Sequence, residues 1–152
     1  MPPNAHLRPA RAADLPGLLA LEATFPGDRM SARQFRRHLA SPRARWQVAE
    51  EGGRLLGYSL VLLRRGTARA RLYSIAVDPA ARGRGLGRRL LAASEQAAAA
   101  AGCTGMVLDV RQDNPAANAL YQDQGYRRVA ALPGYYEDGG DGWRYVRDFA
   151  GP

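Results

Sequence analysis

The sequence predicts one α/β domain built around a mixed β-sheet, and three observations lead to this prediction. The chain has 152 residues, 46% of them hydrophobic, which suits one domain with a sizeable core rather than two. In its second half, runs typical of β-strands alternate with stretches of helical periodicity. A glycine-rich stretch at 82–89 separates one such strand from one such helix. We therefore expect residues 1–152 to form a single domain.

The first half of the chain predicts an edge strand, two helices and a three-stranded antiparallel meander. Residues 6–9 fit a short edge strand, where the proline at its end is tolerated. Leucines spaced three to four residues apart over 11–24 predict a helix, and Ser31 is the expected N-cap of a second helix over 32–40. The three strands of the meander are expected at 46–50, 55–63 and 69–77, with a hairpin-type turn at 51–53.

The second half predicts helices and strands in alternation. A helix from Leu86 to about Gly102 precedes an apolar strand over 105–110. Because a helix separates this strand from the one that ends at Val77, the two are expected to be parallel, with a ligand crevice where their carboxyl ends part. Asn114-Pro115 is a typical helix start and Gly125 a typical helix end. The remaining elements are expected as a helix over 116–124, strands over 126–132 and 143–149, and a loop over 133–142.

The glycine-rich stretch Arg82-Gly83-Arg84-Gly85-Leu86-Gly87-Arg88-Arg89 predicts an anion site. Unpaired N–H groups at a helix N-terminus bind phosphates, glycine allows close approach, and arginine adds permanent charge. A dinucleotide fingerprint starting at Gly83 would require glycine in place of Arg88, and a nucleoside-triphosphate loop requires a lysine, which this chain lacks. A turn that merely opens a surface helix is the alternative, although such a turn needs one glycine rather than three.

The pattern Arg82-x-x-Gly85-x-Gly87 resembles the coenzyme A pyrophosphate loop of the GCN5-related N-acetyltransferase (GNAT) family. The segment from Tyr73 to Leu91, and the segment from Leu108 to Tyr126, resemble the RimI-type ribosomal-protein-alanine N-acetyltransferases of that family. The resemblance covers roughly residues 70–149 and is weak before them. It implies a GNAT-like, mostly antiparallel sheet with a parallel strand pair splayed around acetyl-CoA and helices on both faces. It also implies acetyl transfer from acetyl-CoA to an amine, above all the N-terminal α-amine of a protein.

Carried over to this sequence, the resemblance assigns roles to individual residues. Asp109 stands where the family has its general base, usually a glutamate, and Tyr121 stands where it has its general acid. Phe25, Tyr135 and Tyr136 are implied to contact the acceptor, the two tyrosines from a loop over the peptide. Acetyl-CoA is implied to bind Ile75, Ala76, Val77, Arg82, Gly83, Arg84, Gly85, Leu86, Gly87, Arg88, Asn114 and Ala117.

Elementary acid–base chemistry agrees with an α-amine as acceptor. An α-amine, with a pKa of about 8, is partly neutral at pH 7, whereas a lysine amine, with a pKa of about 10.4, is almost wholly protonated. A weak or water-relayed base such as Asp109 therefore suits an α-amine better. Each assignment has a structural alternative. Asp109 is either a base or the partner of an arginine, Tyr121 is either an acid or a core residue, and Tyr135 and Tyr136 either cover the peptide or merely pack.

Composition limits other functions. Cys103 is the only cysteine, and His6 and His38 lack ligand-like neighbours, so we expect no metal. The net charge of +8 comes from scattered arginines without interleaved aromatic residues, so no specific nucleic acid is predicted. No apolar run approaches 18 residues and no leader is evident, so we expect no membrane span and a cytoplasmic location.

The acceptor itself stays open at this point. A ribosomal protein is one candidate, a lysine or a small-molecule amine is a second, and acidic residues at 137–141 would suit a cationic acceptor. The alternative to an enzyme is a non-catalytic module that binds coenzyme A or associates with RNA. The sequence carries no signal for oligomeric state.

Overall fold

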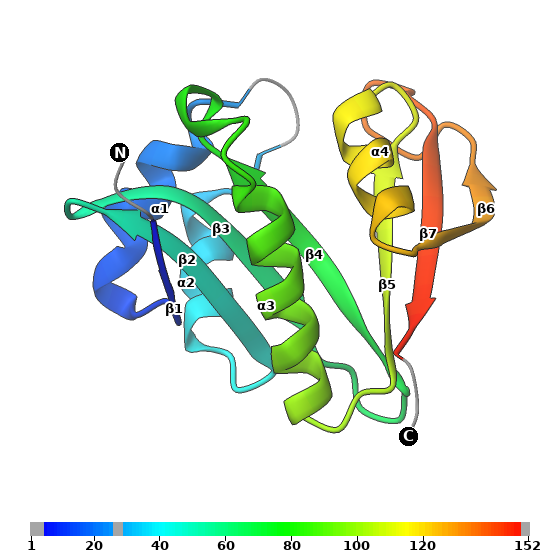
Figure 1. Cartoon of the computed structure of the whole chain (residues 1–152), viewed down its shortest axis with the longest axis horizontal. Coiled ribbons are helices and arrows are strands. Elements are labelled where there is room, and N and C mark those ends of the chain that lie inside the picture. Colours follow the sequence, from blue (N-terminus) through cyan, green and yellow to red (C-terminus); the bar gives the residue numbers. More distant parts are fainter. Residues whose placement is uncertain (1–4, 26–28, 150–152) are drawn as a thin grey trace.

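The structure, a computed structural model, describes residues 5–25 and 29–149. Seven strands form one sheet, with helices packed against it (Figure 1). The helices are α1 (Leu15–Glu22), α2 (Ala32–Ala40), α3 (Leu86–Ala100) and α4 (Pro115–Asp123), with short 3-10 turns η1 (Ala12–Asp14) and η2 (Pro79–Ala81). The strands are β1 (His6–Arg8), β2 (Ala44–Glu51), β3 (Arg54–Leu62), β4 (Arg69–Val77), β5 (Gly105–Arg111), β6 (Arg127–Leu132) and β7 (Gly142–Asp148).

The predicted order of elements is confirmed, with one boundary that differs by several residues. The predicted helix over 11–24 becomes the turn η1 followed by the shorter helix α1. The carboxylate of Asp14 accepts hydrogen bonds from the Arg11 N–H (2.7 Å) and from the Arg8 guanidinium. These contacts hold the first turn in place and leave the α-helix to begin at Leu15. Ser31 caps α2 as predicted, accepting from the Gln34 N–H at 3.1 Å.

The strand order is β1-β2-β3-β4-β5-β7-β6, and among the described strands only the pair of β4 and β5 is parallel. The ladder between them joins Arg69–Arg71 of β4 to Gly105–Val107 of β5, at the amino ends of both strands. Beyond this ladder the two strands diverge, which Figure 1 shows as a widening gap between them. The mixed sheet with one splayed parallel pair is therefore confirmed, and β4 offers an edge toward β5 from Tyr73 to its end.

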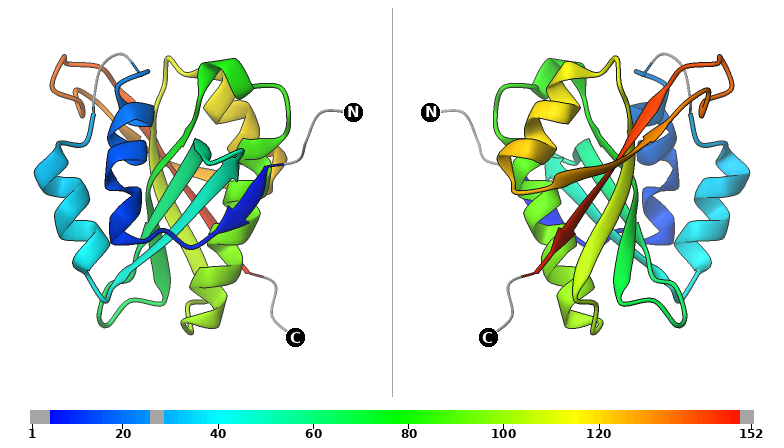
Figure 2. Two further views of the ribbon diagram at one scale, coloured as in Figure 1. Left: turned by 90° about the vertical axis from the view of Figure 1, so that its left-hand side faces the viewer. Right: turned by 90° about the vertical axis from the view of Figure 1, so that its right-hand side faces the viewer.

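Helices cover both faces of the sheet. α3 and α4 lie on one face and α1 and α2 on the other, as two further views show (Figure 2). On the α3 face, Leu91 packs with Leu72 and with residues of β5 and β7. On the opposite face, Leu18 of α1 and Phe35 of α2 pack against Tyr58 of β3. Among residues 5–25 and 29–149, no helix is long and apolar enough to cross a membrane.

A β-bulge at Tyr73 changes which residues of β4 point to which face. Leu60 of β3 pairs with Ser74, but the next residue of β3 pairs with Leu72, so Tyr73 is the extra residue. Leu72, before the bulge, and Ile75, after it, both pack toward α3. The intervening Ser74 faces α1 and α2 instead. At the end of β4, Ser74 and Ile75 therefore point to opposite faces of the sheet.

Candidate active site

The glycine-rich stretch forms the connection between β4 and α3. Gly83 and Gly85 have φ values of +84° and +75°, a left-handed conformation that other residues adopt only at a cost. Gly85 is the N-cap residue of α3, and no side chain of the described residues caps this helix. The N–H groups of its first turn therefore point outward at the positive end of the helix dipole. This is the geometry of an anion site.

A pocket of about 460 Å³ opens between this loop, the end of β4 and helix α4. We call it the glycine-loop pocket. It brings together every residue predicted to bind acetyl-CoA except Arg84, whose guanidinium pairs with Glu51 at 2.6 Å. Ala116 and Leu120 also line it and were not predicted. Its lining residues are Ile75, Ala76, Val77, Arg82, Gly83, Gly85, Leu86, Gly87, Arg88, Asn114, Ala116, Ala117, Leu120 and Tyr121.

Arginines supply the positive charge around this pocket. Arg82 and Arg88 line it, and Arg88 also pairs with Asp123 at 2.6 Å. Both members of this pair are more than half exposed, and exposed pairs contribute little to stability. A phosphate ligand can therefore compete for Arg88 at low cost. Arg89 points elsewhere and donates to the carbonyl of Ala5 at 2.9 Å.

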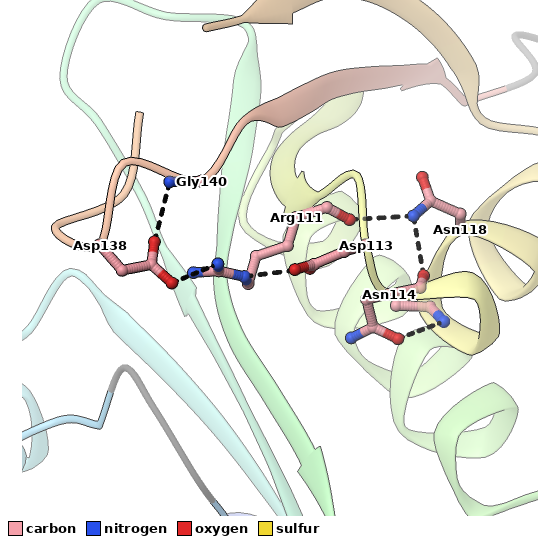
Figure 3. A network of polar contacts seen from close by, with 7 residues as sticks. Arg111, Asp113, Asn114, Asn118, Asp138 and Gly140 are labelled. Carbon is pink, nitrogen blue, oxygen red and sulfur yellow. Dashed lines mark hydrogen bonds and ion pairs between the residues drawn. The ribbon is translucent and has the colours of Figure 1, made fainter. Parts of the chain in front are cut away.

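Asn114 holds the start of α4 on the other side of the pocket. Its side-chain oxygen accepts a hydrogen bond from the Ala117 N–H at 3.1 Å, so it caps the helix as its sequence context predicts (Figure 3). Asn118 reinforces this turn by donating to the carbonyls of Arg111 and Asn114, at 3.0 and 2.8 Å. The cap uses the oxygen of the Asn114 amide and leaves its nitrogen as a donor on the pocket side.

Tyr121 lies on α4 with its side chain buried, and it lines the glycine-loop pocket. Its ring packs against Tyr126 and Tyr145, with centroid distances of 5.9 and 6.1 Å. Within the described part of the chain, its hydroxyl forms no hydrogen bond. Burial, and secondarily the neighbouring Tyr136, raise the pKa of this phenol above its ordinary value. Tyr121 is therefore a protonated donor at neutral pH, with no protein acceptor competing for its proton.

Asp109 of β5 is held by three partners rather than standing free. Arg144 Nε donates to Oδ1 at 2.8 Å, Tyr135 Oη donates to Oδ2 at 2.7 Å, and Arg71 also donates to Oδ2. Burial alone would raise the pKa of this carboxyl group, but the hydrogen bonds from Arg144, Tyr135 and Arg71 lower it to about 2. Of the two roles considered for Asp109, these contacts favour the ion pair. Its arginine partners come from β4 and β7.

The loop between β6 and β7 is tied down by these contacts. Tyr135 is 46% exposed and hydrogen-bonded to Asp109, which raises the pKa of its phenol. Tyr136 packs edge-on against Tyr135, and the guanidinium of Arg111 lies 4.8 Å from its ring centre. Arg111 also pairs with Asp138, which accepts from the Gly140 N–H (Figure 3). The loop is thus ordered by contacts from β5 into a position beside the end of β4.

A second pocket, of about 310 Å³, lies on the α1 and α2 side of β4. We call it the carboxylate pocket, because Glu22 and Asp109 both line it. Its lining residues are Glu22, Arg29, Met30, Gln34, Arg71, Leu72, Tyr73, Ser74, Asp109, Tyr135 and Tyr136. Tyr135 and Tyr136, which were predicted to contact the acceptor, both line this pocket. Phe25 is not among the lining residues and packs against the core beneath α1 and α2.

Sequence reasoning missed a buried polar network beneath the carboxylate pocket. Glu22 is 8% exposed and accepts from Tyr58 Oη at 2.8 Å and from the Met30 N–H at 2.7 Å. Tyr58 Oη is also hydrogen-bonded to Ser74 Oγ, at 2.8 Å. One signal was present in the sequence, because Glu22 follows Leu18 and Leu21 on the apolar face of a helix. A carboxylate on such a face requires buried partners.

The described residues contain no group of three or more His, Cys, Asp or Glu side chains placed to hold a metal ion. His38 is buried beside Tyr73, and burial lowers the pKa of its imidazole.

Comparison with known proteins defines the class. Residues 15–126 match the model of the acetyltransferase (GNAT) family. The chain is 43% identical over 122 residues to the N-alpha-acetyltransferase RimI of Mycobacterium tuberculosis, covering 78% of this chain and 75% of that protein. The chain belongs to the GNAT acetyltransferase family.

Solved structures agree on the fold. The ribosomal-protein-S18-alanine N-acetyltransferase of Escherichia coli superposes with a TM-score of 0.87 at 24% identity, over 97% of this chain and 96% of that one. Ard1 of Thermoplasma volcanium superposes with a TM-score of 0.88 at 20% identity, over 98% and 100%. The predicted GNAT fold is therefore confirmed. The prediction of an N-acetyltransferase is confirmed by the family match and by the RimI relative.

Proposed function

We propose that this chain transfers the acetyl group of acetyl-CoA to the N-terminal α-amine of a protein, by direct attack of the amine on the thioester. The observation that carries the proposal is a pair of pockets lined by successive residues at the end of β4, residues 71–74 in the carboxylate pocket and 75–77 in the glycine-loop pocket. One has an anion-binding helix N-terminus and a protonated tyrosine, and the other has carboxylates. A donor and an acceptor substrate bound there would meet across a single strand.

The glycine-loop pocket fits acetyl-CoA in charge and in shape. The N–H groups from Gly83 to Arg88 would bind the pyrophosphate, with charge from Arg82 and Arg88. Past the short ladder with β5, the edge of β4 from Ile75 to Val77 has N–H and C=O groups available for an extended ligand. The pantetheine arm carries amides that match such an edge, and the Asn114 amide faces it from α4.

Tyr121 supplies the proton for the leaving group. As the amine nitrogen bonds to the carbonyl carbon, the carbon–sulfur bond breaks and its electron pair goes to sulfur. A thiol has a pKa of about 8.5 and a phenol one of about 10, so full proton transfer to a free thiolate is uphill. Tyr121 would therefore act by hydrogen-bonding the sulfur as negative charge develops on it, and its proton would move only as the carbon–sulfur bond breaks. The absence of any competing acceptor among the described residues, and the burial that keeps the phenol protonated, support this role.

The carboxylate pocket suits an amine acceptor, since Glu22, which no arginine of the described residues neutralises, would attract a cationic ammonium group. Tyr135 and Tyr136 would lie over the peptide. Asp109, held by two arginines, would act by fixing this loop. The RimI relative is named for N-alpha-acetylation, and the Escherichia coli neighbour for a ribosomal protein, which supports a protein acceptor of that kind.

The test is acetyl-CoA-dependent release of free thiol with a matched panel of acceptors. Each peptide is offered with a free N-terminus, with an acetylated N-terminus, and with an internal lysine as the only amine; spermidine and an aminoglycoside complete the panel. We expect turnover only where the α-amine is free. Turnover confined to lysine peptides or small amines would overturn the proposal for the acceptor, and coenzyme A binding without turnover on any amine would favour a non-catalytic module.

A further inference from the structure

We propose that Ser74, Tyr58 and Glu22 form a proton relay that deprotonates the attacking amine, with Glu22 as the final acceptor. The inference rests on the proposed acetyl transfer and deepens it, because it assigns the base side of the reaction to three residues to which the family resemblance gives no catalytic role. It also replaces Asp109 in that role.

Ser74 lies on β4 at the boundary between the two pockets. Ser74 lines the carboxylate pocket, whereas the next residue, Ile75, lines the glycine-loop pocket. The bulge at Tyr73 produces this arrangement, because it turns Ser74 toward α1 and α2 and Ile75 toward α3. The Ser74 hydroxyl therefore lies where an amine bound in one pocket would approach a thioester bound in the other.

The hydrogen bonds among Ser74, Tyr58 and Glu22 have a defined direction. An ionised carboxylate only accepts, so Tyr58 donates its one proton to Glu22 Oε1, at 2.8 Å. The Tyr58 oxygen must then be the acceptor in its 2.8 Å bond with Ser74, which makes Ser74 the donor. With its proton committed to Tyr58, the Ser74 oxygen is left as an acceptor on the pocket side. The three groups thus point one way, from the pocket toward Glu22.

The charge on Glu22 bears on its role as proton acceptor. Within the described residues no arginine pairs with Glu22, whose partners are the Tyr58 hydroxyl and the Met30 N–H. Asp109 differs, because Arg144 and Arg71 both neutralise it. Burial, followed by the charge of Glu22, raises the pKa of Tyr58, so this phenol gives up a proton only as it receives one. Such a residue transmits a proton without storing a charge.

Each proton that leaves one group of the relay is taken up by the next. The amine lone pair forms the new carbon–nitrogen bond, and one amine proton moves to Ser74 Oγ while the Ser74 proton moves to Tyr58 Oη. The Tyr58 proton moves to Glu22, which becomes a carboxylic acid. The departing sulfur takes its proton from Tyr121. After product release, Glu22 loses its proton to solvent and Tyr121 regains one, so no other reactant is needed.

The experiment compares Ser74→Ala and Ser74→Thr with the wild-type chain, on whichever amine the wild type acetylates. Ser59→Ala is the matched control. Ser59 follows Tyr58 on β3 and is buried, and within the described part of the chain its hydroxyl bonds only to Ser94 of α3, at 2.7 Å. We expect Ser74→Ala to lower kcat by about tenfold or more with the KM for acetyl-CoA unchanged, and Ser74→Thr to restore it, because a relay requires the hydroxyl. Ser59→Ala should stay within about twofold of the wild type.

Glu22→Gln is the second variant, and we expect it to lower kcat by about 10²-fold with thermal unfolding measured alongside. Unchanged kcat in Ser74→Ala would overturn the relay even if Glu22→Gln failed to fold. Equal losses in Ser74→Ala and Ser59→Ala, or no rescue by Ser74→Thr, would assign the network a structural role only. A wild-type chain that acetylates no amine would overturn the proposed function as well, which separates the two failures.

Discussion

Replacing Tyr121 by phenylalanine separates a catalytic hydroxyl from a packing ring, because the structure gives the two parts of this side chain different surroundings. The ring packs against Tyr126 and Tyr145, and phenylalanine would keep both contacts. The hydroxyl has no hydrogen-bond partner among the described residues. The variant should therefore fold normally and fail at the step that needs a proton.

The size of both effects can be estimated. A positioned general acid contributes about 10²–10⁴-fold in rate, which corresponds to about 2.7–5.4 kcal/mol of transition-state stabilisation. On the stability side, the substitution breaks no hydrogen bond of the described residues and removes a hydroxyl from the lining of the glycine-loop pocket. The free energy of unfolding should then change by less than about 1 kcal/mol, in either direction.

Tyr126→Phe is the matched control. Tyr126 is also buried, its ring touches that of Tyr121, and its hydroxyl donates to Glu95 at 2.8 Å. Removing that hydroxyl should lower the free energy of unfolding by about 1–3 kcal/mol, because the bond involves a charged acceptor. It should leave kcat within about twofold of the wild type. The two variants are expected to show opposite patterns in activity and stability.

The assay measures thiol release at saturating acetyl-CoA, together with chemical denaturation and the Kd for coenzyme A. Tyr121→Phe should lower kcat by at least about 10²-fold with the Kd within about twofold of wild type. Wild-type kcat in Tyr121→Phe would refute the acid assignment. A loss of kcat matched by a loss of coenzyme A affinity would instead show that the hydroxyl only shapes the pocket.

Two further predictions concern the glycine loop and Asp109. Gly85→Ala should lower the free energy of unfolding by about 1–2 kcal/mol and weaken coenzyme A binding by about tenfold or more. Gly66→Ala is the control, because Gly66 has a similar φ of +78° in an exposed turn, and it should show the same loss of stability with unchanged binding. Chemical denaturation and calorimetric titration of both variants measure the two effects. Asp109→Asn should lower the free energy of unfolding by about 1–2 kcal/mol at pH 7, a value reduced for screening by solvent. The pKa of Asp109 is about 2 in the folded protein and about 3.9 in the unfolded chain. The stabilisation by Asp109 is therefore fully present at pH values above the unfolded pKa of about 3.9, and it is lost as the pH falls through the folded pKa of about 2. The difference in the free energy of unfolding between wild type and variant should therefore be full at pH 7, begin to fall at pH 4 and be clearly smaller at pH 2.5, as measured by chemical denaturation. A constant difference would contradict the ion-pair role.

The elements of the fold were predictable because their signals are local. Periodicity, the N-cap at Ser31, the Asn114-Pro115 start and the glycine-rich stretch each act within a few residues of the structure they specify. The parallel pairing of β4 and β5 followed from the helix between them. The glycine-loop pocket was predictable for the same reason, since it is formed by the ends of elements that the sequence marks clearly.

The carboxylate pocket was not predictable from local signals. Asp109 receives its arginines from positions 71 and 144, on two other strands, and Glu22 meets Tyr58 from a different element. Nothing within a few residues of any of these positions specifies the pairing. No local sequence signal predicts the bulge at Tyr73 either, because the bulge depends on the register between β3 and β4 along their whole length.

The shorter acid at position 109 has a consistent explanation in this geometry. Asp109 lies directly opposite Arg144 in the β5–β7 ladder, where a short side chain meets its cross-strand neighbour close to the sheet. A glutamate would carry its carboxylate one methylene further from the strand and from this partner. The short side chain thus favours a fixed ion pair and a fixed Tyr135 over a mobile base. Because Asp109 in this ion pair does not serve as the base, the amine proton must leave by another route. Glu22 lines the same pocket, and it is a buried carboxylate that no arginine of the described residues neutralises.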